Sequence, residues 1–186
     1  MGRLDEVHHP EWHTCLHLVS DAYELLVPTQ FGIRILHFGW AGGENLFWTE
    51  PSPTESADAW RVYGGHRLWH APEHPIRTYS PDNDPIEWHW DGQQLLLRQP
   101  TEPRTGIQKQ VALTLHADSV HVRHRLVNRN LWEVRLAAWA LSVMRPSGVA
   151  LIPPRAVPTA PRRAAARAPC RALGVHRYER PAPALG

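Results

Sequence analysis

The chain has 186 residues, a length typical of one domain, and 20 Lys/Arg against 18 Asp/Glu give a formal net charge of +2. Residues 1–144 hold 12 basic and 17 acidic residues, a net of −5, whereas residues 145–186 hold eight and one, a net of +7. The acidic body offers no basic stripe, so no nucleic-acid partner is expected for residues 1–144. The two cysteines, Cys15 and Cys170, indicate neither a disulfide framework nor a CxxC metal site.

The N-terminal residues are polar and lack the apolar segment of a secretory signal. No run in the chain approaches the roughly 18 apolar residues of a membrane span, so we expect no membrane insertion and a reduced, cytoplasmic setting. Residues 1–14 are interpreted as a polar lead-in. Its histidines, His8, His9 and His13, have no spacing that implies a metal site.

Apolar and polar residues alternate in short runs from Cys15 onward, which is the pattern of half-buried β-strands. Turn signals about ten residues apart favour antiparallel sheets over βαβ units, and Asp91-Gly92 is a strong hairpin signal. We therefore predict an all-β fold, an antiparallel β-sandwich, for residues 15–144. The expected strands are 15–19, 23–27, 31–38, 86–90, 94–99, 107–116, 119–127 and 134–144.

Two of these strands carry further predictions. The strand 134–144 is apolar on both faces toward its end, as a central sandwich strand would be. In the strand 119–127, Val120 and Val122 share one face, and the other face carries His121, Arg123 and Arg125. We expect this polar face to be solvated, with the lining of a cleft as the alternative.

Residues 145–186 change in character, with ten Ala, eight Arg and eight Pro and no hydrophobic period after Ile152. Such a segment buries too little apolar surface to offset its chain entropy, so we predict an irregular, disordered tail. One interpretation is a basic tail that contacts nucleic acid or acidic surfaces. The favoured interpretation is a shifted reading frame, because GC-rich DNA read out of frame gives Ala-Arg-Pro-rich sequence.

The stretch from Trp60 to Asp84 combines aromatic rings with histidines, arginines and acids. Gly64-Gly65 permits a tight turn or a close approach to a bound molecule, and three prolines (Pro72, Pro75 and Pro81) indicate a stiff loop. Rings beside charged and amide groups suit a hydroxylated ligand such as a sugar. The alternative is a surface loop whose tryptophans fill the core.

Three histidines in this stretch, His66, His70 and His74, are spaced by four residues. On a helix they would share a face and could bind zinc. The glycine pair before His66 and the proline at position 72 argue against that helix. We therefore predict neither a metal site nor a cofactor.

The segment Gly64–Glu73, GGHRLWHAPE, resembles the galactose mutarotase-like superfamily, which includes aldose 1-epimerases. The segments Val120–Asn130 and Leu136–Met144 are similar to that family's strand ending in an Asn turn and to the strand after it. The resemblance covers roughly residues 15–150. It implies part of a large β-supersandwich, normally much longer than this chain, with the Gly-Gly loop at the mouth of a sugar cleft.

Family enzymes place a general acid and a general base, a histidine and a glutamate, on opposite sides of the pyranose. By the resemblance, Trp139 occupies or neighbours the position of the histidine, and an indole cannot transfer a proton at neutral pH. The tail carboxylate, Glu179, has no matching context. The resemblance thus implies a truncated or frameshifted member that binds a sugar with impaired catalysis, and its catalytic residues stay unassigned.

The expected ligand is a monosaccharide or sugar derivative. Arg67 would make bidentate hydrogen bonds to hydroxyls or to an acidic sugar group, and Trp69 would stack on a sugar face. One alternative is an active aldose 1-epimerase, with His66, His70 and Glu73 as substitute acid and base groups. The other is a structural or interaction β-domain without a small ligand. The expected carbohydrate-binding residues are His66, Arg67, Trp69, His70, Glu73, Asp82 and Asn83.

Overall fold

The structure is a computed structural model that describes residues 2–50, 60–146, 148–149 and 151. The chain divides into two units, residues 1–148 and 149–186, and all the strands of the described residues belong to the first. Nearly all of the predicted tail, 145–186, lies outside the described residues, so its prediction stays untested. The described part of the chain contains no helix long and apolar enough to cross a membrane.

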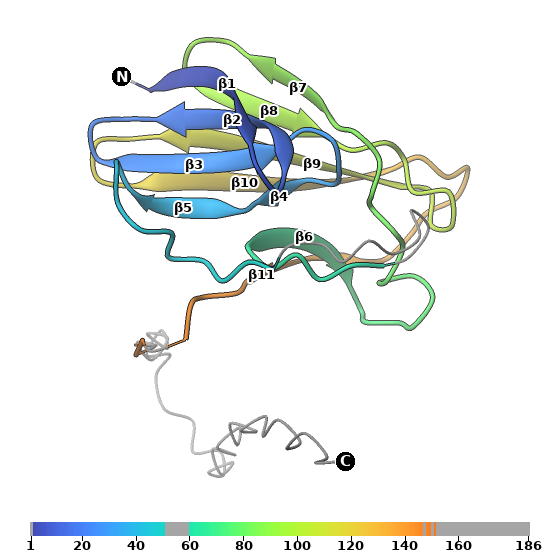
Figure 1. Ribbon diagram of the computed structural model, residues 1–186. Coiled ribbons are helices and arrows are strands. Elements are labelled where there is room, and N and C mark those ends of the chain that lie inside the picture. The colour runs from blue at the N-terminus through green and yellow to red at the C-terminus, as the bar shows by residue number, and fades with distance from the viewer. Residues whose placement is uncertain (1, 51–59, 147, 150, 152–186) are drawn as a thin grey trace, which may run out of the picture. The chain divides into compact units, whose positions relative to one another are not determined.

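The described residues form strands and no helix, which confirms the all-β prediction (Figure 1). The strands are β1 (Arg3–His9), β2 (His13–Val19), β3 (Tyr23–Pro28), β4 (Arg34–Ile35), β5 (His37–Trp40), β6 (His66–Ala71), β7 (Glu87–Trp90), β8 (Gln94–Arg98), β9 (Ile107–Leu115), β10 (Val120–Asn128) and β11 (Ala137–Ser142).

These strands make three antiparallel sheets. Two sheets have four strands, in the orders β1-β2-β3-β5 and β10-β9-β8-β7, and the third has the order β11-β6-β4. In Figure 1 the first two sheets lie one in front of the other, with β6 and β11 along one side. The arrangement is sandwich-like, as the sequence predicts.

The main core fills the space between the sheets. Alternate residues point inward, so Leu16 and Leu18 of β2 meet Leu95 and Leu97 of β8, all with 0% exposure. Burying one such side chain contributes about 1.5–3 kcal/mol to folding. The third sheet joins the same core through Leu68, so β6 is fixed by its inward face.

Two predicted turns form as expected. Asp91 lies between β7 and β8, where its Oδ1 accepts hydrogen bonds from the backbone N–H groups of Gln93 and Gln94 at 2.8 and 2.7 Å. Gly65 has a φ of 68°, and a Cβ there would lie 2.3 Å from the carbonyl oxygen of Ile35. The close approach predicted for the glycine pair is therefore to the chain's own backbone.

Two segments predicted to lack a strand are strands, which corrects the sequence analysis. Residues 3–9 of the supposed polar lead-in pair along their whole length with β2. Residues 66–71, predicted within a loop, form β6 between β4 and β11. Both segments carry polar residues on at least one face, so neither has a strong hydrophobic period, and backbone pairing decides their structure instead.

The predicted strand 31–38 and the predicted central strand 134–144 also need correction. The first is divided between β4 and β5, which join different sheets. The second is shorter than predicted, and β11 lies at the edge of its sheet with five of its six residues exposed. Its apolar residues therefore lie on an edge strand that no other described segment covers.

Candidate functional site

Strand β6 divides the predicted sugar-binding residues between its two faces. Side chains alternate along a strand, so Arg67 and Trp69 lie on one face, and His66 and His70 lie on the other. Leu68, between the two histidines, packs into the main core. The face that carries the histidines is therefore the inward face of this sheet, and the seven predicted residues do not form one cluster.

Arg67 and Asp82 are bound to each other inside the fold. Oδ1 of Asp82 accepts hydrogen bonds from Nη2 of Arg34 at 2.6 Å and from Nη2 of Arg67 at 3.0 Å. Burial acts to raise the pKa of Asp82, but the two guanidiniums outweigh it and lower that pKa. Burial lowers the pKa of Arg67 to about 9, against the opposing effect of Asp82. This pair stabilises the fold; Asn83, which follows it, is half-buried.

Aromatic rings gather on the same side of β6 as Arg67. The ring of Trp69 lies 6.0, 5.6 and 5.2 Å from the rings of Trp60, Tyr79 and Trp139, measured between centroids. The guanidinium carbon of Arg67 lies 4.8 Å from the Trp69 ring centroid, a cation–π contact. Trp69 is only 9% exposed, so it serves the packing of this side more than it offers a free stacking surface.

Glu73 and His66 also have partners within the protein. The hydroxyl of Tyr79 donates a hydrogen bond to the exposed carboxylate of Glu73. Nε2 of His66 lies 2.8 Å from Nε2 of His124, and its Nδ1 lies 2.8 Å from Oγ of Ser142. Burial lowers the pKa of both histidines, to about 4 for His66, so both rings are neutral at pH 7.

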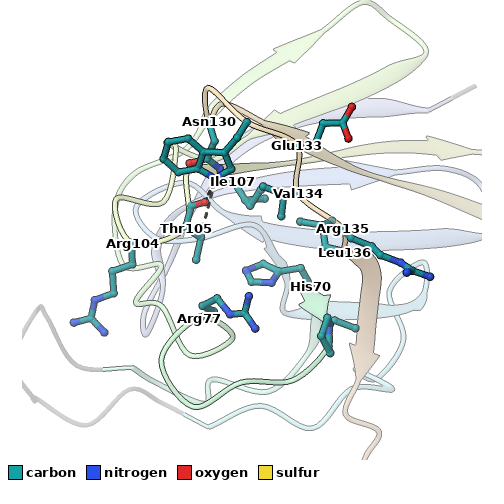
Figure 2. Close-up of a pocket in the computed structure, with 13 residues that line it drawn as sticks. His70, Arg77, Arg104, Thr105, Ile107, Asn130, Glu133, Val134, Arg135 and Leu136 are labelled. Atoms are coloured by element: carbon teal, nitrogen blue, oxygen red, sulfur yellow. Dashed lines mark hydrogen bonds between the residues drawn. The ribbon is translucent and has the colours of Figure 1, made fainter.

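Of the predicted residues, His70 lines a pocket, which has a volume of about 380 Å³ (Figure 2). The pocket is built from the end of β6, the loop that leads into β9, and the segment that joins β10 to β11. It is lined by His70, Ala71, Pro72, Arg77, Arg104, Thr105, Ile107, Asn130, Trp132, Glu133, Val134, Arg135 and Leu136.

A buried carboxylate orients the imidazole of His70. Nε2 of His70 lies 3.4 Å from Oε2 of Glu102, and Oγ1 of Thr105 donates to the same oxygen at 2.6 Å. The other oxygen of Glu102 pairs with the ammonium of Lys109. His70, Glu102 and Lys109 are 6%, 2% and 1% exposed. The network is therefore shielded from water.

The protonation of this network follows from its contacts. Burial acts to raise the pKa of Glu102, but the hydrogen bond from His70, the charge of Lys109 and the bond from Thr105 together lower it. The carboxylate is thus ionised and can only accept, which places the Nε2 proton on His70. An imidazole with a single proton, on Nε2, has a lone pair on Nδ1, and Nδ1 of His70 makes no hydrogen bond to the described residues.

The charged residues that line the pocket are mostly basic. Arg77, Arg104 and Arg135 line it with one acid, Glu133, among apolar residues such as Ile107 and Leu136. In Figure 2 the side chain of Arg77 points toward the His70 ring, and the guanidiniums of Arg104 and Arg135 lie at opposite ends of the view. Arginine forks match carboxylate and phosphate groups, so the arrangement favours an anionic ligand.

Sequence reasoning missed Glu102 and Lys109, although one signal for them was present. Lys109 has the same parity along β9 as Val111 and Leu113, which point into the core. A lysine at an inward position needs a buried counter-charge. That reasoning leads to the acid in the preceding loop, Glu102, and from there to His70.

Within residues 2–50 and 60–146 no group of three or more His, Cys, Asp or Glu side chains is arranged to hold a metal ion. Comparison of the chain with protein families, with curated proteins and with solved structures finds no match.

Proposed function

We propose that this chain binds an acidic sugar derivative, a hexuronate or a sugar phosphate, in the pocket beside His70. The observation that carries the proposal is the buried His70–Glu102 pair facing a pocket with three arginines. The pocket volume of about 380 Å³ lies in the range of small-ligand sites. The choice of a sugar as the ligand comes from the resemblance of the sequence to the galactose mutarotase-like superfamily.

Each part of the ligand has a matching group. Arg77, which lines the same pocket as His70, supplies a guanidinium for the carboxylate or phosphate. Asn130 supplies an amide that can bond the hydroxyls, and Nδ1 of His70 accepts a hydrogen bond from one hydroxyl. Trp132, which is 66% exposed, offers an indole face to the C–H side of the ring. Of the residues predicted from sequence, this site uses His70.

Titration with galacturonate, glucuronate and glucose 6-phosphate, followed by tryptophan fluorescence, tests the proposal. We expect saturable binding of at least one acid and weaker binding of glucose and galactose. Arg77→Ala should weaken binding about tenfold or more, because a charge-assisted hydrogen bond contributes about 1.5–3 kcal/mol. The matched control is Arg3→Ala on β1, which lines no part of this pocket. No saturable change with any of the acids at millimolar concentration would rule the proposal out.

The oriented imidazole also favours a second candidate function, proton transfer at the anomeric centre of a bound sugar. A histidine whose Nε2–H is held by a carboxylate presents its Nδ1 lone pair as a general base. The required acid is less evident, since Figure 2 shows Glu133 turned away from His70. NMR exchange between anomers of a bound acidic sugar tests this function. A rate equal to that of His70→Gln would exclude it for that sugar.

A further inference from the structure

A second hollow lies on the outer face of the sheet β10-β9-β8-β7. It has a volume of about 470 Å³ and shares no lining residue with the pocket at His70. Cross-strand pairing places Arg125, Gln110 and Arg98 in one row and Arg123, Ala112 and Leu96 in the next. Its lining consists of Gln94, Leu96, Arg98, Gln110, Ala112, Arg123, Arg125, Val127 and Arg129. The polar face of β10 thus lines a groove, the alternative that the sequence left open.

The charges in this groove are nearly all positive. It has four arginines and no acidic residue in its lining, and the neighbouring acid, Glu87, contacts Arg98 at 3.2 Å. The guanidinium of Arg129 donates to the side-chain oxygen of Gln108 at 2.8 and 3.3 Å. The side chains of Arg123 and Arg125 make no hydrogen bond or ion pair to the described residues. Two guanidiniums about 7 Å apart along the strand are therefore open to an anion.

The other lining groups indicate which kind of anion fits. Gln110 lies between Arg125 and Arg98, and Gln94 lies at the end of the groove beside Leu96. Their amide nitrogens bond Gln108 and Thr114 at 3.4 and 3.3 Å, which leaves their carbonyl oxygens to accept from a ligand. Leu96 and Ala112 form a narrow apolar floor. Amides bind hydroxyl groups, and an apolar floor covers the C–H face of a pyranose. No aromatic ring lines the groove itself, and the indole of Trp88 lines a smaller hollow that shares Leu96 and Arg98 with it. The groove therefore has no row of stacking rings of the kind on which single-stranded nucleic acids depend.

We propose that this groove binds a linear acidic polysaccharide, a polyuronate, with carboxylates on Arg123 and Arg125 and hydroxyls on the two glutamines. Successive guanidiniums along β10 meet successive carboxylates of an extended chain, Arg129 follows them in the sequence, and Arg98 lies across the sheet in the row of Arg125. The groove is separate from the pocket beside His70, so this inference stands whether or not that pocket binds an acidic sugar. If both proposals hold, the groove would bind a polymer of the same acidic sugars that the pocket beside His70 binds singly.

The test uses the full chain and an oligogalacturonate of defined length, followed by isothermal titration calorimetry at low and at physiological salt. We expect saturable binding that weakens as salt rises. The double variant Arg123→Gln/Arg125→Gln should bind at least tenfold more weakly. The single variant Arg125→Lys, which keeps the charge and loses the fork, should fall between it and the wild type. All these positions are exposed, and thermal unfolding of each variant verifies that it is folded.

Three controls distinguish binding in this groove from charge attraction elsewhere on the protein. Arg3→Gln, an exposed arginine on β1, should leave oligogalacturonate binding unchanged, and the uncharged polymer dextran should not bind. Arg123→Gln/Arg125→Gln should cause the same loss in a His70→Gln background as in the wild type, which separates the groove from the pocket beside His70. Equal loss in Arg3→Gln would show general charge attraction and overturn the proposal. Tighter binding of a single-stranded DNA of matched charge would overturn it in favour of nucleic acid, and so would the absence of oligogalacturonate binding at low salt.

Discussion

Nε2 of His70 lies 3.4 Å from Oε2 of Glu102, at a point where both side chains are more than nine-tenths buried. Glu102 belongs to the tight turn before β9, and Lys109 of β9 holds its second oxygen. The imidazole is therefore oriented by a group that is itself fixed by a strand of the core. This chain of contacts links the fold of the sandwich to the floor of the pocket.

The ion pair between Glu102 and Lys109 predicts strong energetic coupling. Glu102→Gln leaves the buried ammonium without its counter-charge, and Lys109→Met leaves the carboxylate without one. Each change should lower the free energy of unfolding by about 3–5 kcal/mol, and the double variant should lose less than the sum of the two. Urea unfolding of the four proteins in this cycle measures the coupling, and additive losses would argue against a direct pair.

Asp82 is predicted to stabilise the fold by neutralising two arginines. Asp82→Asn leaves Arg34 and Arg67 buried together and should cost about 3–5 kcal/mol. The neighbouring Asp84→Asn is the control, because Asp84 is exposed and should change stability by less than about 0.5 kcal/mol. Urea unfolding at pH 7 compares the two variants. Equal stability of both would refute the role of Asp82.

The lowered pKa of Asp82 also predicts an acid sensitivity with a definite sign. Its pKa is lower in the folded chain than the roughly 3.9 of an unfolded one, so the unfolded chain binds more protons near that pH. The stabilisation is therefore complete above about pH 5 and is lost as the pH falls through the folded pKa. Wild-type stability should fall more steeply below pH 4 than that of Asp82→Asn, as unfolding at pH 3 to 5 would show.

His66 predicts a separate pH dependence at higher pH. Burial lowers its pKa from 6.5 to about 4, so between these values the unfolded chain takes up a proton that the folded chain does not. Stability should fall between pH 7 and pH 5, by on the order of 1 kcal/mol once solvent screening of this half-buried ring is allowed for. His66→Gln should reduce that slope, because other partly buried histidines with lowered pKa values, His124 and His37, remain. An unchanged slope in the variant would assign it to other groups.

Two glycines with similar backbone angles give a matched test of close packing. Gly65 has a φ of 68° and would place a Cβ 2.3 Å from the carbonyl oxygen of Ile35. Gly42 has a φ of 72° and no atom within 4 Å of its Cβ position. Gly42→Ala should cost only the backbone strain, about 1 kcal/mol, and Gly65→Ala should cost at least 2 kcal/mol more. Thermal unfolding of the two variants compares the costs.

The edge strand β11 predicts self-association. Its six residues, AAWALS, include no charge, and five of them are exposed. An uncharged edge is a template for pairing with another chain. Light scattering should show association that grows with protein concentration, and Ala140→Lys should reduce it, whereas Ala140→Ser should not. A monodisperse wild type at high concentration would contradict this expectation.

Much of the fold could be predicted because its strands carry a strong period. Leu95, Leu97, Val111 and Leu113 stand at every second position of β8 and β9, and they line the core as that spacing requires. The period fails for β1 and β6, in which a few apolar residues stand among charged residues and histidines without regular alternation. Such strands are held by pairing with neighbours distant in the sequence, and that pairing is not visible in a local pattern.

The candidate site was predictable only in part. Sequence proximity grouped His66, Arg67, Trp69 and His70, but neighbouring residues of a strand point to opposite faces. Arg67 is 5% exposed, because its charge is satisfied by a residue 15 positions away. His70 reaches the pocket because the turn at Glu102 folds over it. These long-range contacts depend on the packing of the sheets, which the spacing of residues does not encode.

Binding of galacturonate to the wild type and to His70→Gln is the most direct test of the pocket beside His70. The wild type should bind the acid saturably, and the variant should bind at least several-fold more weakly while keeping its thermal stability within a few degrees. Glucose, which lacks the carboxylate, should bind more weakly than galacturonate to the wild type. Equal affinity of wild type and His70→Gln for galacturonate, or no binding by either at millimolar concentration, would contradict the proposed site.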